Sequence, residues 1–558
     1  MARMNATAPE NIVQGSDGVS RPPVAARRSL WQRYREMRVD VPEVGLSLDC
    51  SRAGLDDGFL EEIASDARRA IDAMAALEAG AIANVDERRM VGHYWLRAPE
   101  LAPSAAIREE LRAACDGVCA FAARVHAGEV RGTDGRFEHV LHVGVGGSAT
   151  GAQLICGALA DADDPIAVHF VDNADPDGID RTLARLDGAL GRTLTSVVSK
   201  SGWTPTPLHG MRELESAYRR AGLDFDRHAI ATTMADSQLD SLARERGWLE
   251  RFPLWEWVGG RTSATSAVGL LPAALQGADV GELLAGARAM DDATRELDLR
   301  GNAALLLALA WHALGRGRGE RDMVVVPYKD RLAGLVRYVQ QLVMESVGKR
   351  LDRGGAIAQQ GLTVYGGRGS CDQHAYFQQL FEGAPDFFVT FVLVGEDRHA
   401  AAIEVEPGLT LGDFLFGYAE GTRNALYQAG RESVTIGVRS VSARSLGALI
   451  ALFERAVGIY AELIDVNAYD QPSVAKDAAR PVVELQRAVT AFVAQLDEPQ
   501  TADAIAEGIG RPEEVETVFK LLDRLARDYG RGIAATSYGS PFSARFGPAQ
   551  SRLAGGLR

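Results

Sequence analysis

The feature that most constrains the fold is a repeated alternation between short apolar runs and amphipathic segments of helix length. The apolar runs end near glycine, serine or aspartate, and hydrophobic residues in the segments between them recur at helical spacing. This rhythm is typical of βαβ units, which build parallel sheets. The predicted strands form two series: residues 139–145, 167–171, 194–199 and 229–232, then residues 323–327, 362–365, 387–394 and 434–438.

Two such series indicate two α/β domains, and a cleft between domains is the default position of a ligand site. Helical periodicity predicts further helices at residues 59–78, 104–126, 302–314 and 446–464, and two short ones within 501–527. We therefore expect a flexible arm over residues 1–27, a helical N-terminal region over 28–130, α/β domains over 131–290 and 291–480, and a helical C-terminal region and tail over 481–558.

Composition excludes several classes of protein. The 558 residues carry 60 Lys+Arg against 75 Asp+Glu, a net charge of −15, which argues against a general nucleic-acid binder. The longest apolar helical stretch, residues 303–314, is shorter than the roughly 20 residues that span a bilayer. The 5 cysteines are scattered without a CxxC pair, and no secretory signal is recognisable, so we expect a cytoplasmic protein without a bound metal.

The first candidate phosphate-binding loop, residues 144–151, directly follows a predicted strand. Its glycines let the backbone approach an anion, Ser148 offers a hydroxyl, and the following helix offers its N-terminal amides. The spacing Gly144-x-Gly146-x-x-Ala149 also fits a loose dinucleotide fingerprint, with Asp172 as the ribose-binding acid. A nucleotide therefore stays open as the ligand of this loop taken alone.

A second loop favours a sugar phosphate. Residues 199–204 also follow a predicted strand and precede a helical pattern, and they hold four side chains suited to a monophosphate: Ser199, Lys200, Ser201 and Thr204. The alternative is a turn rich in serine and threonine with a solvated lysine. Both loops would open at the carboxyl edge of one sheet, where open α/β sheets bind ligands.

Two polar side chains are candidates for chemistry on the largely apolar helix predicted over residues 335–347. Gln341 and Glu345 are four residues apart and share one face. An acid in so apolar a stretch is costly to bury unless it is paired or used in chemistry. The alternative is a surface Glu345 that pairs with Lys349 one turn later.

Arg261 and His374 are further candidates on predicted loops. Arg261 follows a glycine pair and precedes two hydroxyl side chains. His374 lies after Gly369-Ser370 on a loop that leads into a helix. A single histidine is more often structural than catalytic, and for His93, which lies among aromatic residues, we favour the structural interpretation.

The order of these segments resembles that of one family, phosphoglucose isomerase in its longer bacterial form. The matching stretches are residues 78–84, 90–97, 144–151, 199–204, 259–272, 327–349, 369–390, 412–433 and 501–532. The resemblance implies an α/β fold with two SIS-type (sugar isomerase) domains, each a flavodoxin-like parallel sheet flanked by helices, plus helical N- and C-terminal parts. It also implies a homodimer without metal or other cofactor that interconverts glucose 6-phosphate and fructose 6-phosphate.

The resemblance also implies residue roles. Glu345 would be the base that moves a proton through a cis-enediol, Arg261 would stabilise its negative charge, and His374 would open the sugar ring, in some members across the dimer interface. Substrate-binding roles fall to Gly147, Ser148, Ser199, Lys200, Ser201, Thr204, Gln341 and Gln471.

The chain departs from the family at its last motif, Asp-Gln-x-Gly-Val-Glu-x-x-Lys. Ser473 replaces the glycine, Ala475 the glutamate and Ala478 the lysine that assists ring opening, so Lys476, two residues earlier, is the candidate replacement. Trp203 replaces a glycine in the second phosphate loop. These departures keep two alternatives open: an isomerase for a different sugar phosphate, and a sugar-phosphate-binding protein with impaired catalysis.

Overall fold

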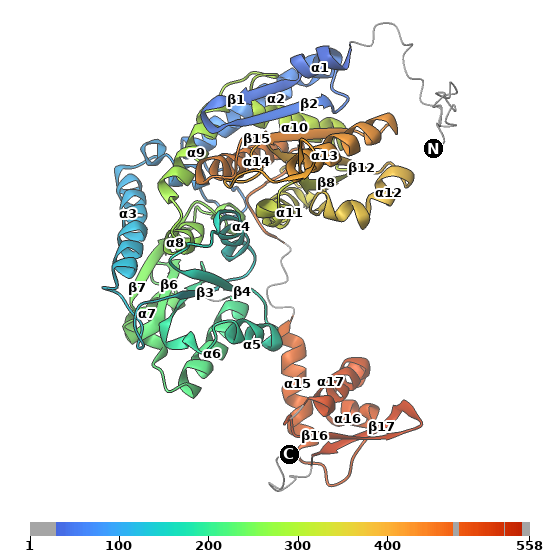
Figure 1. Cartoon of the computed structure of the whole chain (residues 1–558). Coiled ribbons are helices and arrows are strands. Elements are labelled where there is room, and N and C mark those ends of the chain that lie inside the picture. The colour runs from blue at the N-terminus through green and yellow to red at the C-terminus, as the bar shows by residue number, and fades with distance from the viewer. Residues whose placement is uncertain (1–28, 203, 473–478, 529, 550–558) are drawn as a thin grey trace. The chain divides into compact units, whose positions relative to one another are not determined.

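The computed structural model describes residues 29–202, 204–472, 479–528 and 530–549. The chain forms two compact units, Met1–Asp470 and Gln471–Arg558, and Figure 1 shows their elements. Each unit is described by itself.

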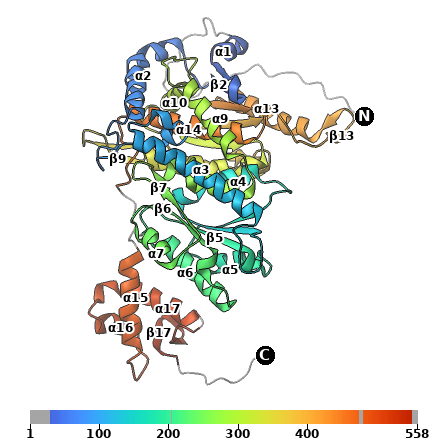
Figure 2. The same cartoon turned by 90° about the vertical axis from the view of Figure 1, so that its left-hand side faces the viewer.

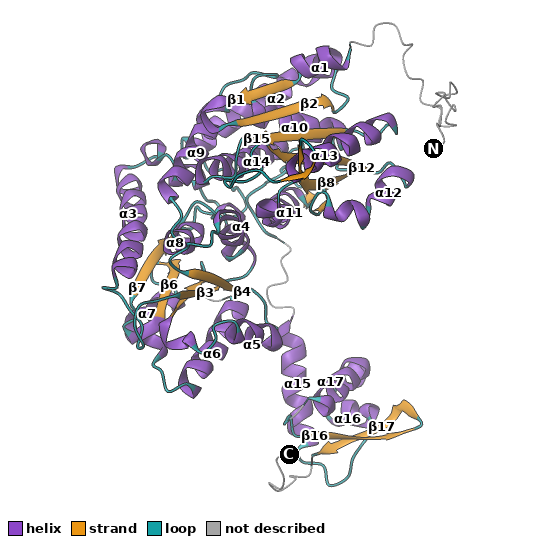
Figure 3. Cartoon of the chain, viewed as in Figure 1, coloured by secondary structure: helices purple, strands orange, loops and turns teal. Residues whose placement is uncertain are grey.

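The first sheet of the large unit is entirely parallel (Figure 3). Its strands are β3 (His139–Val143), β4 (Ala167–Val171), β5 (Thr193–Val198), β6 (Ala229–Met234) and β7 (Glu250–Leu254). The spatial order β4-β3-β5-β6-β7 is the flavodoxin-like order, as predicted. The sequence did not predict β7, because it is an edge strand of sequence ERFPL whose charges and proline hide the apolar pattern.

The second sheet has a parallel core and an antiparallel edge. The parallel strands are β8 (Asp322–Pro327), β11 (Val364–Gly366), β12 (Phe387–Val394) and β15 (Ser433–Val438), in the order β11-β8-β12-β15. The antiparallel strands are β2 (Leu46–Arg52), which pairs with β15, and β1 (Arg38–Val41), which pairs with β2 and forms the edge of the sheet.

The expected helical region over residues 28–130 does contain long helices, but it also contributes these two strands, which the sequence did not predict. Leu48 of β2 lies opposite Ile436 of β15, almost the whole length of the large unit away in sequence. The strand is therefore stabilised by a tertiary partner that the local periodicity does not reveal.

Helices cover both faces of the first sheet, and alternate strand residues face different helices. One face packs against α3 (Ala105–Ala127), α4 (Thr150–Leu159) and α8 (Ala267–Gln276), and the other against α5 (Pro176–Ala184), α6 (Pro205–Arg220) and α7 (Gln238–Arg246). Val140 of β3 thus belongs to the core with Leu154 of α4, whereas Leu141 belongs to the core with Leu214 of α6.

The second sheet shares its hydrophobic core with five helices. These are α2 (Asp57–Glu78), α9 (Val280–Ala293), α10 (Ala303–Leu314), α11 (Ala333–Val347) and α14 (Ala443–Leu463). Of these helices, α10 and α14 are almost wholly buried. Every residue of α14 from Ser445 onwards is buried, and α9 lies beside it (Figure 2). A helix that is buried all round must carry few unpaired charges.

The remaining elements of the large unit are short or peripheral: α1 (Leu30–Glu36), α12 (Phe377–Glu382), α13 (Leu411–Gln428), β9 (Lys349–Leu351), β10 (Ile357–Gln360), β13 (Glu404–Glu406) and β14 (Leu409–Thr410). Within the described ranges, no helix combines the length and apolarity needed to cross a membrane.

A buried cluster of charges ties the N-terminal region to α9 and α14. Arg97 lies 2.6 Å from Asp291 Oδ2 and 2.5 Å from Glu454 Oε2, and none of these three side chains is exposed. Arg455, the residue after Glu454, forms an ion pair with Glu78 in the same cluster. Opposite charges therefore neutralise one another where the two long helices and the N-terminal region meet.

The C-terminal unit has its own small core. It consists of α15 (Ala479–Val493), α16 (Ala502–Gly508), α17 (Val515–Arg527) and an antiparallel hairpin of β16 (Ile533–Tyr538) and β17 (Ser540–Pro548). Gly539 turns the hairpin with φ +69°, a conformation that favours glycine. The three helices agree with the expected helical region, and the hairpin lies in the tail, for which the sequence predicted no structure because its small and polar residues give no clear strand pattern.

We expect Arg97→Met to lower the free energy of unfolding by about 3–5 kcal/mol, because it leaves buried carboxylates without their partner. Urea unfolding followed by tryptophan fluorescence would measure the change. The control is Arg244→Met, which removes an ion pair with Asp236 at 3.7 Å between exposed side chains and should change stability by less than about 0.5 kcal/mol. Equal stability of Arg97→Met and the parent protein would contradict this role of the cluster.

Candidate functional site

The candidate site lies around the guanidinium of Arg261. Arg261 lies on the short turn Gly260–Thr262 that follows β7, and its side chain is only 5% exposed. Its Nη1 donates to Glu345 Oε2 at 3.3 Å, and its Nη2 donates to the carbonyls of Ala468 (2.7 Å) and Asp470 (2.8 Å). Burial lowers the pKa of Arg261, and the Glu345 carboxylate opposes that shift.

Glu345 lies in the last turns of α11 with its side chain 33% exposed, so solvent or a substrate can reach it. Gln341, one turn earlier, donates from Nε2 to Glu345 Oε1 at 3.2 Å. Thr150, at the start of α4, donates to Gln341 Oε1 at 2.5 Å. The prediction that Gln341 and Glu345 share one face is confirmed, and Thr150 connects this face to the first phosphate loop.

The alternative role of Glu345, a surface carboxylate paired with Lys349, is wrong. Lys349 forms its ion pair with Asp470, Nζ to Oδ1 at 2.8 Å. Its ammonium reaches Glu345 only at the main-chain carbonyl, at 3.1 Å. Burial lowers the pKa of Lys349, and the hydrogen bond to Asp470 opposes this decrease.

The first phosphate loop approaches the Arg261 turn through glycine backbones. Gly147 and Gly260 pack so closely that a Cβ on Gly147 would lie 2.2 Å from the Gly260 carbonyl carbon. Ser263 Oγ also donates to the Gly147 carbonyl at 3.0 Å. Ser148, the hydroxyl residue of the loop, closes the turn Gly146–Ser148 and is partly exposed.

The second loop is fixed by its lysine. Lys200 Nζ donates to the carbonyls of Glu256 (2.8 Å) and Val258 (2.6 Å), in the segment that leads to Arg261. Ser199 is buried, Ser201 is exposed, and Thr204 caps the start of α6. Trp203 lies outside the described residues.

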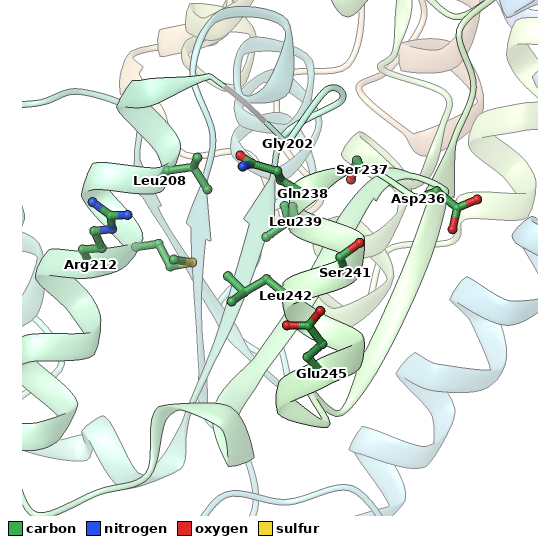
Figure 4. A pocket seen from close by; sticks show the side chains of 11 residues that line it. Gly202, Leu208, Arg212, Asp236, Ser237, Gln238, Leu239, Ser241, Leu242 and Glu245 are labelled. Carbon is green, nitrogen blue, oxygen red and sulfur yellow. The ribbon is translucent and has the colours of Figure 1, made fainter.

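A cavity of about 420 Å³ adjoins this loop between α6 and α7 (Figure 4). Gly202 lines one side, and apolar side chains such as Leu208 and Leu242 line the space between the two helices. The helices α6 and α7 cover the sheet face opposite to α4, so the cavity lies on that face and adjoins the second loop at Gly202.

His374 lies outside the group of side chains around Arg261 and Glu345. It is exposed at the end of the short turn Cys371–His374, and over the described ranges no hydrogen bond or ion pair joins it to Arg261 or Glu345. Gln471 is the first residue of the C-terminal unit, and Lys476 lies outside the described residues. The roles of these three residues stay predictions.

Sequence reasoning did not assign a function to Thr150, Asp470 or the ammonium of Lys349. Thr150 lies inside the glycine loop and Asp470 directly before Gln471, so both positions were within motifs of interest. Nothing in local spacing indicated that Lys349 would contact Asp470.

Within the described parts of the chain, no group of three His, Cys, Asp or Glu side chains is arranged to hold a metal ion. Asp172, the candidate ribose-binding acid, accepts a hydrogen bond from Gln153 Nε2 at 2.9 Å.

Comparison with known proteins gives the family. A sequence model of the family described as "Phosphoglucose isomerase" matches residues 49–410. A glucose-6-phosphate isomerase of Geobacter sp. (strain M21) is 52% identical over 514 residues, covering 91% of this chain and 97% of the relative. The chain belongs to the phosphoglucose isomerase family.

Other relatives agree. A glucose-6-phosphate isomerase of Geobacter sulfurreducens is 53% identical over 525 residues, covering 92% of this chain and 99% of the relative. The crystal structure of a glucose-6-phosphate isomerase from Chlamydia trachomatis has a TM-score of 0.72 at 25% identity and covers 87% of this chain and 94% of that one. A hypothetical protein from Thermus thermophilus has a TM-score of 0.63 at 29% identity and covers 79% of this chain and 99% of that one.

We expect Gly147→Ala to lower kcat/KM by about 100-fold or more, because displacement of Gly260 by even 1 Å moves the neighbouring Arg261. Steady-state kinetics with fructose 6-phosphate would measure it. The matched control is Gly157→Ala on α4, where an added methyl group would have no described neighbour within 4 Å outside its own helix. Unchanged kinetics of Gly147→Ala would show that the close approach of the two loops is not required.

Proposed function

We propose that the chain interconverts glucose 6-phosphate and fructose 6-phosphate. Membership of the family and the glucose-6-phosphate isomerases that are about half identical to this chain over most of its length support this activity. The observation that carries the proposal is the contact of Arg261 with an accessible Glu345, at 3.3 Å.

Glu345 acts as the base. Its carboxylate takes the proton from C2 of the open-chain aldose and returns it to C1, through a cis-enediol. Negative charge develops on the sugar oxygens during this step, and the buried guanidinium of Arg261 stabilises it from a fixed position. Gln341, held by Thr150, positions the substrate beside the carboxylate.

The sugar phosphate binds at the two loops of the first sheet. The backbone at Gly147 and the hydroxyl groups of Ser148, Ser199, Ser201 and Thr204 hold its oxygens, and Lys200 supplies the local positive charge that an acidic protein needs. Because Lys200 is also bonded to the carbonyls of Glu256 and Val258, phosphate binding at this loop is linked to the segment before Arg261.

Ring opening precedes proton transfer and uses His374, with Lys476 in place of the lysine absent at Ala478. The exposed position of His374 fits a histidine that acts in the site of the other copy of a homodimer. The enzyme needs no metal or cofactor and works in the cytoplasm. None of the 5 cysteines, all of them described residues, forms a disulfide, which fits a reducing compartment.

A second candidate rests on the altered last motif. Ala475 and Ala478 stand where the family has a glutamate and a lysine, so a different or already open sugar phosphate is a candidate substrate. A coupled assay with fructose 6-phosphate separates the two candidates. Activity within roughly tenfold of an ordinary family member, a barrier difference of about 1.4 kcal/mol, leaves no reason to propose another substrate.

We expect Glu345→Gln to lower kcat by about 10³-fold and to abolish deuterium exchange at C2, because the amide cannot accept the proton. NMR in deuterium oxide would follow the exchange, and calorimetry should find binding of fructose 6-phosphate retained. Glu282→Gln, which changes an exposed ion pair with Arg444, is the control and should behave as the parent. Unchanged exchange in Glu345→Gln would assign the base to another residue.

We expect Ala478→Lys to raise kcat on cyclic glucose 6-phosphate if the missing lysine limits ring opening. The comparison substrate is an open-chain sugar phosphate, on which the variant should match the parent because no ring has to be opened. No gain on the cyclic substrate would mean that Lys476 already assists ring opening or that the natural substrate differs.

A further inference from the structure

A buried lysine links the helix of the catalytic base to the end of the large unit. Lys349 begins β9, two residues after α11 ends, and its side chain is 5% exposed. An ammonium removed from water is costly unless oxygen atoms surround it. Here three oxygens do: Asp470 Oδ1 at 2.8 Å, the Asp470 carbonyl at 3.0 Å and the Glu345 carbonyl at 3.1 Å.

Each contact has a distinct consequence. The Glu345 carbonyl lies in the last turn of α11, where helix carbonyls lack intrahelical partners and a cation is favourable. The contact with the Asp470 carbonyl fixes the backbone directly before Gln471. The ion pair with Asp470 Oδ1 neutralises a buried carboxylate close to the reacting groups.

That neutralisation matters because Arg261 is also present. Arg261 Nη2 donates to the same Asp470 carbonyl at 2.8 Å, while Nη1 faces Glu345. The Asp470 carboxylate already stabilises the Arg261 cation. If Lys349 lost its charge, Asp470 would lose its ion-pair partner at 2.8 Å and would attract the guanidinium more strongly. Arg261 would then be drawn from the position in which it contacts Glu345.

We propose that Lys349 is a positioning residue for the isomerisation: it neutralises Asp470 and holds its backbone against the end of α11, so that Arg261 stays directed at Glu345. The proposal rests on the proposed function. Lys349 need not touch the sugar; its effect is transmitted through Asp470 and Arg261.

The test compares Lys349→Met with the double variant Lys349→Met/Asp470→Asn in the full-length protein, with fructose 6-phosphate as the probe. We expect Lys349→Met to lower kcat by about 100-fold with a change in KM below about threefold, since positioning affects the transition state more than binding. The double variant removes the unpaired carboxylate and should recover about tenfold of the lost rate, because Arg261 is no longer attracted away.

The control is Arg321→Met, which removes a partly buried cation, 12% exposed and paired with Glu432 at 2.6 Å, directly before the amino end of β8. It should lose stability and keep its kinetic constants. The proposal would be overturned if the kcat of Lys349→Met were within about threefold of the parent value. It would also be overturned if the double variant were as slow as the single one.

Two further outcomes are also decisive. If Lys349→Met does not fold, the double variant is measured alone, because it contains no unpaired charge at this position. A kcat of the double variant about tenfold below that of the parent supports the role of Lys349, and a kcat equal to that of the parent overturns it. If the parent protein itself turns over no phosphorylated aldose, the proposed function fails, and the positioning role fails with it. An active parent with an unaffected Lys349→Met overturns only the role of Lys349.

Discussion

The site depends on the way one buried guanidinium distributes its donors. Arg261 directs one amino group to Glu345 and the other to the carbonyls of Ala468 and Asp470. Arg261 itself lies on the turn after β7, while its partners come from α11 and from the end of the large unit. A planar guanidinium suits this task better than an ammonium, because its donors have a fixed geometry.

A second group of buried charges supports the framework around the site. Arg97 and Arg455 face Asp291, Glu454 and Glu78 where α2, α9 and α14 meet. Such clusters add little stability over an apolar core, but each member depends on the others once it is buried. The same physical rule governs Lys349 and Asp470, where pairing also controls the charge next to Arg261.

Much of the fold could be predicted from the sequence, because local hydrophobic periodicity and glycine positions determine where its strands, helices and loops lie. Alternating strands and helices predict a parallel first sheet, the resemblance to the family implied its flavodoxin-like order, and the glycines of residues 144–151 indicate a loop close to an anion or to another backbone. The sequence did not predict β1, β2, β7, β16 and β17, because strands at or next to a sheet edge and hairpins of small residues depend on partners more than on their own periodicity.

The sequence by itself determined the residue types and their spacing: a carboxylate and an amide on one face of α11, an arginine after a glycine pair, and two hydroxyl-rich loops at strand ends. Only the tertiary structure decided their partners. Spacing allowed Lys349 to pair with Glu345, yet the fold brings Asp470 within 2.8 Å, and burial makes that contact the more favourable one. Local geometry fixes which face a side chain occupies, whereas the opposite charge that it meets comes from a residue brought near only by the packing of distant segments.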